Sequence, residues 1–179
     1  MRTRIVILEV MLLAGILVGR AFADKAVAEI KSPSDPTISY GKVRFEDRED
    51  GVQVHAELVN VKPAGQHGIH IHQYGSCAND GKAAGDHYNP SHTPHGHVKN
   101  GPQKSHPGDM GNIEIKEDGT GVLDIYFPGV NVAGAPYSIG GRTVVLHEKT
   151  DDFSQPSGNA GTRMGCGTIL LSDSQDNKL

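Results

Sequence analysis

Hydrophobic and polar residues alternate along much of the chain beyond residue 24, with the two-residue period of a strand that buries one face. The clearest case is the run 52–59, in which Val52, Val54, Ala56 and Leu58 occupy every second position. Similar patterns predict strands at 26–31, 39–46, 68–73, 113–115, 122–126, 143–148 and 165–171. No segment beyond residue 23 has a convincing helical period, so the pattern predicts an all-β protein.

Turn residues separate these predicted strands. Asp118-Gly119 lies between the 113–115 and 122–126 runs, and this dipeptide predicts a β-hairpin that joins them. About eight short strands with glycine and proline between them predict a Greek-key antiparallel β-sandwich or barrel. The glycine-rich stretch 128–142 suits a crossover between sheets.

Two connections are too long to be simple turns, one at 74–111 and one at 149–163. Structureless loops of this length in a compact domain are usually functional or disordered. The sequence therefore predicts one domain with two long functional loops. A bound metal would give the first loop an order that its own sequence cannot supply.

The first 23 residues have the composition of a secretory signal peptide. Basic residues at Arg2 and Arg4 precede a short uncharged apolar stretch at 10–18, and Ala21-Phe22-Ala23 forms an A-x-A cleavage site. A membrane anchor is the alternative, but a span needs about 20 apolar residues. We expect a signal peptide at 1–23, a single domain at 24–179, and export to a periplasm or to the extracellular space.

Charge and cysteine content narrow the function further. Without residues 1–23, which hold Arg2, Arg4, Arg20 and Glu9, the chain keeps 14 basic and 20 acidic residues and a formal charge of −6. This balance argues against nucleic acid or an anionic membrane as the main partner. The two cysteines, Cys77 and Cys166, would most often form a disulfide in an exported protein, and two metal thiolates are the alternative.

Histidines lie where two predicted strands could bring them together. His70 and His72 are separated by one residue, so both imidazoles point to one face of a strand while Ile69 and Ile71 point to the other. His147 ends a second apolar run. An H-x-H pair is a weak signal alone, and two exposed histidines are the alternative reading.

The long first loop carries a stronger pattern. His87, His95, His106 and Asp109 offer three imidazoles and a carboxylate, which suits a closed tetrahedral zinc site. A ligand set of nitrogen and oxygen without thiolate fits zinc and copper. A solvated histidine-rich loop is the alternative, and His92 and His97 in the same loop show that not every histidine need be a ligand.

At these residues the chain resembles the copper/zinc superoxide dismutase family, in a bacterial exported form. Two runs look like the family's signatures, and shorter runs around the remaining histidines also fit. The matching segments are Gly68-Ile69-His70-Ile71-His72-Gln73-Tyr74-Gly75-Ser76-Cys77, Gly158-Asn159-Ala160-Gly161-Thr162-Arg163-Met164-Gly165-Cys166-Gly167-Thr168-Ile169, Gly85-Asp86-His87-Tyr88-Asn89-Pro90, His106-Pro107-Gly108-Asp109 and 142–149.

The resemblance implies a copper ion and a zinc ion that share His87 as a bridging imidazolate. It implies Arg163 over the copper channel, Asp151 as a carboxylate between a copper histidine and a zinc histidine, and a disulfide between Cys77 and Cys166. The implied copper ligands are His70, His72, His87 and His147, and the implied zinc ligands are His87, His95, His106 and Asp109.

Two departures from the animal enzymes leave questions open. The interval from His95 to His106 is two residues longer, so His97 competes with His95 as a zinc ligand, although the distance from His87 favours His95. The 149–163 loop is about seven residues shorter and lacks the acidic pair and lysine that steer substrate. In that loop, Ser154-Gln155-Pro156-Ser157-Gly158 looks bacterial.

The implied reaction is disproportionation of superoxide anion to oxygen and hydrogen peroxide, with His87 and Arg163 as the catalytic residues. Copper would be reduced by one superoxide and oxidised by the next. Two other readings remain, a non-catalytic dismutase-like protein and an exported copper or zinc buffer. A homodimer is possible, and the sequence predicts no membrane anchor.

Overall fold

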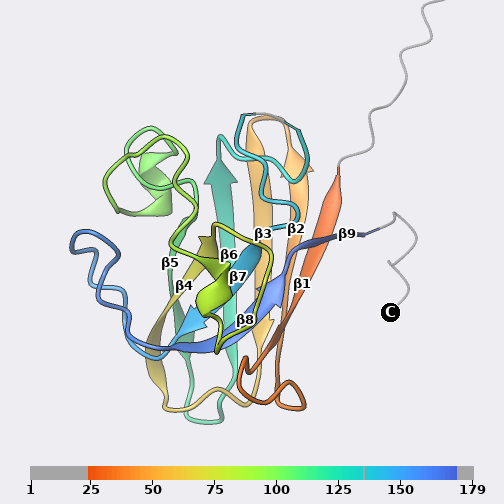
Figure 1. The fold of residues 1–179 in the computed structure, drawn as a ribbon, viewed down its shortest axis with the longest axis vertical. Helices are drawn as coiled ribbons and strands as arrows, with labels where there is room; N and C mark the ends of the chain where they lie inside the picture. The colour runs from red at the N-terminus through yellow and green to blue at the C-terminus, as the bar shows by residue number, and fades with distance from the viewer. Residues whose placement is uncertain (1–23, 135, 173–179) are drawn as a thin grey trace, which may run out of the picture.

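A computed structural model describes residues 24–134 and 136–172 of the chain. The signal peptide expected at 1–23 lies outside these residues. Strands dominate the fold (Figure 1): β1 (Lys25–Lys31), β2 (Ser39–Arg48), β3 (Gly51–Leu58), β4 (Gly65–His72), β5 (Asp109–Ile115), β6 (Gly121–Pro128), β7 (Thr143–His147), β8 (Arg163–Thr168) and β9 (Leu170–Ser172). Two single-turn 3₁₀ helices, η1 (Lys82–Ala84) and η2 (Val98–Asn100), lie in the loop between β4 and β5.

The strands form one antiparallel sheet in the order β5-β4-β7-β8-β1-β2-β3-β6, with β9 also paired to β1. This sheet curls into a nearly closed barrel, so the predicted all-β Greek-key fold is confirmed. The strand expected at 165–171 is divided at Ile169, because β8 ends at Thr168 and β9 begins at Leu170. The 128–142 stretch carries the chain from β6, at one edge, to β7 between β4 and β8, as a crossover should.

The alternating residues of the strands fill the barrel interior. Val52, Val54, Ala56 and Leu58 of β3 are all buried, as their period predicted. Ile69 and Ile71 of β4 pack into the same core. Every second residue of these strands therefore leaves water, which is the main favourable contribution to folding.

The prediction of a hairpin at Asp118-Gly119 is wrong. The turn itself forms, with Lys116 and Thr120 joined by a backbone hydrogen bond of 2.8 Å. The strands on either side do not pair with each other, because β5 pairs with β4 and β6 pairs with β3 along its whole length. A turn dipeptide fixes only the local reversal of the chain, whereas the choice of partner strand depends on where each strand buries its apolar face.

The long loops lie on the outside of the barrel. The β4–β5 loop (73–108) and the β7–β8 loop (148–162) touch each other where Gln155 meets His95. Within residues 24–134 and 136–172, no helix has the length and apolar character that crossing a membrane requires.

Candidate metal centre

Two neighbouring strands place three histidines on the outer face of the barrel. His70 and His72 of β4 point away from the core, and β7 pairs with β4 so that its last residue, His147, lies beside them. All three side chains are nevertheless buried, because the two long loops cover this face. The alternation of β4 therefore places isoleucines inside the barrel and imidazoles under the loops.

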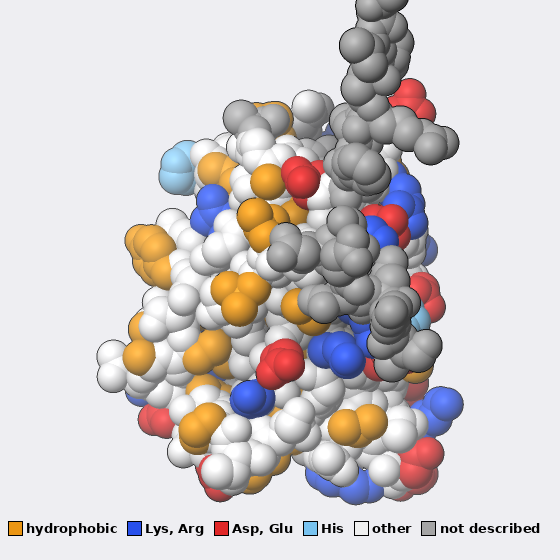
Figure 2. All heavy atoms as spheres, turned by 90° about the vertical axis from the view of Figure 1, so that its right-hand side faces the viewer, with side chains coloured by type: hydrophobic (Ala, Val, Ile, Leu, Met, Phe, Trp, Pro, Cys, Tyr) orange, Lys and Arg blue, Asp and Glu red, His pale blue; other side chains and the backbone are white. Residues whose placement is uncertain are grey.

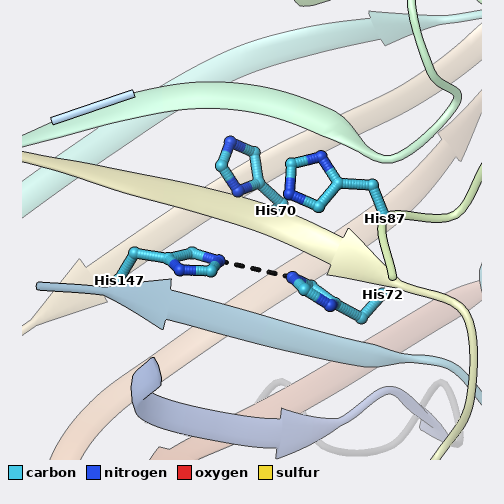
Figure 3. A group of neighbouring side chains, drawn as sticks. All are labelled: His70, His72, His87 and His147. Carbon is cyan, nitrogen blue, oxygen red and sulfur yellow. Dashed lines mark hydrogen bonds between the residues drawn. The ribbon is translucent and has the colours of Figure 1, made fainter. Parts of the chain in front are cut away.

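The first cluster consists of His70, His72, His87 and His147 (Figure 3). One nitrogen from each ring lies within 4.8 Å of those of the others. Nε2 of His72 faces Nε2 of His147 at 3.3 Å, and the rings of His70 and His87 lie 4.1 Å apart between centroids. Four buried imidazole nitrogens converge on one point, and the alternative of exposed histidines is excluded for this set.

The second cluster consists of His87, His95, His106 and Asp109. One oxygen of Asp109, Oδ1, lies 2.9 Å from Nδ1 of His87, 2.9 Å from Nδ1 of His95 and 3.0 Å from Nδ1 of His106. Two ligands on a tetrahedral zinc with bonds of 2.0–2.1 Å are about 3.3 Å apart. The spacing of these atoms is therefore close to that of a zinc ligand set.

The outward nitrogen of several rings is already bound, which selects the nitrogen that faces each cluster. Nδ1 of His72 lies 2.9 Å from the carbonyl oxygen of Gly85, and Nε2 of His70 lies 2.8 Å from Oδ2 of Asp151. A second partner of this kind fixes the tautomer and orientation of a metal-binding histidine.

The fit to metal rests on polar atoms that the protein leaves without a hydrogen bond. Nδ1 of His70, His95 and His106 is fully buried, yet none makes a hydrogen bond, and the last two approach Asp109 without the alignment for one. A buried polar atom without a partner is costly. Metal coordination would satisfy all three atoms.

Asp151 links the two clusters from behind. Its carboxylate accepts hydrogen bonds from Nε2 of His70 at 2.8 Å and from Nε2 of His95 at 2.9 Å. The side-chain amide of Asn112 bonds both the N–H and the C=O of Asp151, at 2.7 and 2.9 Å. Sequence reasoning missed Asn112, because nothing in its local pattern indicates a partner 39 residues away.

Burial and repulsion from neighbouring rings keep three rings of the first cluster, His72, His87 and His147, unprotonated. Burial, with the neighbouring His70, lowers the pKa of His87 to about 4 and that of His147 to about 3. Burial also lowers the pKa of His72 well below its ordinary value. These rings are neutral at pH 7, which is the state that a metal ligand requires.

The second cluster combines opposite charges. Burial alone would lower the pKa of His95, but the carboxylates of Asp109 and Asp151 outweigh burial and raise it to about 9. Burial alone would raise the pKa of Asp109, but the imidazoles of His106, His87 and His95 hold it well below its usual range. Metal-free protein at pH 7 therefore holds a proton on His95 that a cation can replace.

The other four histidines, His55, His67, His92 and His97, lie outside both clusters. His97 caps η2, where its ring accepts a hydrogen bond from the N–H of Lys99, and it stacks on Phe153 rather than facing Asp109. His55 is partly exposed on β3. His67, for which the sequence suggested no role, is buried, with its ring nitrogens 2.8 Å from the carbonyl oxygen of His147 and 2.9 Å from that of Pro63.

Arg163 is held in place beside the first cluster by two hydrogen bonds. Its guanidinium donates to the carbonyl oxygens of Gly81 and Gly85, both at 2.6 Å. A disulfide of 2.09 Å joins Cys77 to Cys166, so it ties the segment that holds these carbonyls to β8. The disulfide expected from the sequence is confirmed, and metal thiolates are excluded.

A pocket of about 890 Å³ opens over the clusters. Its wall includes His87, His106 and His147 of the clusters, together with Arg163 and Lys149. The wall also includes Asp86, so the two cationic side chains and one carboxylate leave a net positive charge at the pocket. A local positive charge within a chain of net negative charge suits capture of a small anion.

The chain is similar to known proteins along most of its length. The family model described as copper/zinc superoxide dismutase (SODC) matches residues 39–169. The chain is 38% identical over 141 residues to an extracellular Cu-Zn superoxide dismutase of Caenorhabditis elegans, covering 75% of this chain and 62% of that protein.

Two further matches cover more of the partner's length. The chain is 34% identical over 167 residues to an extracellular Cu-Zn superoxide dismutase of Brugia pahangi, covering 88% of this chain and 82% of that protein. The crystal structure of the clock protein EA4 superposes with a TM-score of 0.74 at 33% identity, covering 86% of this chain and 98% of that one.

Proposed function

Because the chain belongs to the copper/zinc superoxide dismutase family, we propose that it converts superoxide to oxygen and hydrogen peroxide at the centre described above. Copper would be held by the first cluster, His70, His72, His87 and His147, and zinc by the second, His87, His95, His106 and Asp109. The observation that carries the proposal is that both clusters include the single ring of His87. A metal buffer would not need one imidazole common to two ligand sets.

Copper, when bound, supplies the one-electron chemistry that the reaction needs. The chain's own groups do the rest. Arg163, whose guanidinium stays charged, docks the superoxide anion in the pocket. His87 is the group that can hold and pass a proton at Nε2, because its other nitrogen, Nδ1, faces Oδ1 of Asp109 at 2.9 Å in the second cluster, where zinc would bind. Asp151 fixes the orientation of a ligand in each cluster.

The proposal is tested by metal analysis and pulse radiolysis of the protein before and after copper loading. We expect superoxide consumption far above that of free copper at equal concentration. His147→Ala should abolish activity while zinc stays bound, and His106→Ala should weaken the binding of zinc. The matched control is His97→Ala, which removes a histidine of the same loop outside both clusters. Metal binding without a rate above the free-copper control would indicate a buffer instead.

The role of Arg163 has its own test. Arg163→Glu places a negative charge at the anion pocket, so we expect slower turnover at low superoxide and an inverted dependence on ionic strength. Arg44→Glu is a control, since Arg44 is a partly exposed arginine on β2 that pairs with Glu57 and does not line the pocket. An unchanged rate and an unchanged salt dependence in Arg163→Glu would refute the role.

We also propose that the protein is exported, in a bacterial type of the family, to a periplasm or the extracellular space. Two matched relatives are named extracellular, and a disulfide is typical of oxidising compartments. The short β7–β8 loop supports the bacterial type. Figure 2 shows hydrophobic side chains among charged ones on one face of the molecule. A homodimer is part of the proposal, and analytical ultracentrifugation would test it.

A further inference from the structure

The side chain of Gln155 in the β7–β8 loop makes two hydrogen bonds to the backbone of His95 in the β4–β5 loop. Its Oε1 accepts from the N–H of His95 at 2.9 Å, and its Nε2 donates to the C=O of His95 at 2.8 Å. A side-chain amide that pairs with both groups of one residue acts like a neighbouring strand. Within the described residues, no other hydrogen bond reaches either backbone group of His95.

His95 needs such support because its loop supplies little. It lies between Pro94 and Gly96, outside any strand or helix. The N–H of Gly96 donates to Oδ2 of Asp109 at 2.8 Å, which fixes the chain on the side of the second cluster. Gln155 fixes the backbone of His95 itself. The His95 side chain, which is fully buried, is thereby held between Asp109 and Asp151.

Gln155 is itself held in place. Asp152 and Gly158 close the segment around it, since the N–H of Asp152 donates to the C=O of Gly158 at 2.9 Å and the N–H of Gly158 donates to the C=O of Ser154 at 2.8 Å. Pro156, the next residue after Gln155, lines the pocket over the clusters. The amide therefore connects the pocket wall to the second cluster.

We propose that Gln155 is a positioning residue, which aligns His95 for zinc and couples zinc binding to the pocket wall. This rests on the proposed function, because it takes the second cluster as the zinc site. Partners that orient metal ligands typically account for about 10–100-fold in metal affinity.

The test compares Gln155→Met, which keeps the size of the side chain but removes both hydrogen bonds, with Gln103→Met. Gln103 is an exposed glutamine of the β4–β5 loop. Zinc affinity is measured by competition with a chromophoric chelator. We expect zinc to bind about 10–100-fold more weakly in Gln155→Met, with the metal-free melting temperature close to that of the control.

Two results would overturn the proposal. One is a zinc affinity of Gln155→Met within twofold of that of Gln103→Met. The other is weaker zinc binding accompanied by an equal loss of metal-free stability, which would make the contact structural only. Failure of the proposed function is recognised separately, since His106→Ala would then bind zinc as well as the unmodified protein does.

Discussion

Removing the disulfide by Cys77→Ser together with Cys166→Ser should strongly destabilise the protein. The two cysteines are 89 residues apart in the sequence. In the chain-entropy model, opening a loop of that length restores roughly 15 cal/mol/K to the unfolded chain, which is about 4.6 kcal/mol at 25 °C. This is a large part of the 5–15 kcal/mol that typically separates folded from unfolded domains.

Urea denaturation of the metal-free protein measures this loss without the contribution of bound metal. At a slope of about 2 kcal/mol/M, the midpoint should fall by roughly 2 M. Arg163 should respond too, because Cys77 anchors the segment whose carbonyls at Gly81 and Gly85 hold its guanidinium. The metal-loaded double variant should therefore capture superoxide more slowly than the unmodified protein. A midpoint shift worth less than about 1 kcal/mol, with an unchanged slope, would refute the reasoning.

Three further predictions concern the clusters. In Asp151→Asn the side-chain amide cannot accept strong hydrogen bonds from both His70 and His95, so its zinc affinity should be about 10–100-fold weaker. Chelator competition measures this affinity, and an unchanged value would contradict the prediction. Gly158→Ala puts a Cβ 1.8 Å from Oδ1 of Asp151. In urea denaturation its free energy of unfolding should fall by about 1–3 kcal/mol more than that of Gly101→Ala, because Gly101 has a similar φ but open space around it. Zinc binding at pH 7 should release about one proton from His95, whose pKa is raised to about 9, so the apparent zinc affinity should rise with pH up to that value. Equal calorimetric heats of zinc binding in buffers of different ionisation enthalpy would exclude this proton release.

The local pattern of the sequence determined the strands and the chemistry of the site. A period of two reports which face of a strand is buried, and it placed Ile69 and Ile71 inside and His70 and His72 outside. The types and order of the candidate ligands limited the metals, because imidazole and carboxylate suit zinc and copper. Two cysteines in a chain with an expected signal peptide indicated a disulfide.

The tertiary structure decided the contacts across long separations that neither the local pattern nor the family resemblance indicated. The turn at Asp118-Gly119 could not reveal that its two strands pair with different partners. His95 and His97 are alike in sequence, and only the path of the loop turns one toward Asp109 and the other onto Phe153. Gln155 shows nothing in its own neighbourhood of its contact 60 residues away. Such contacts depend on loop geometry, which is set by packing of the whole barrel rather than by any local period.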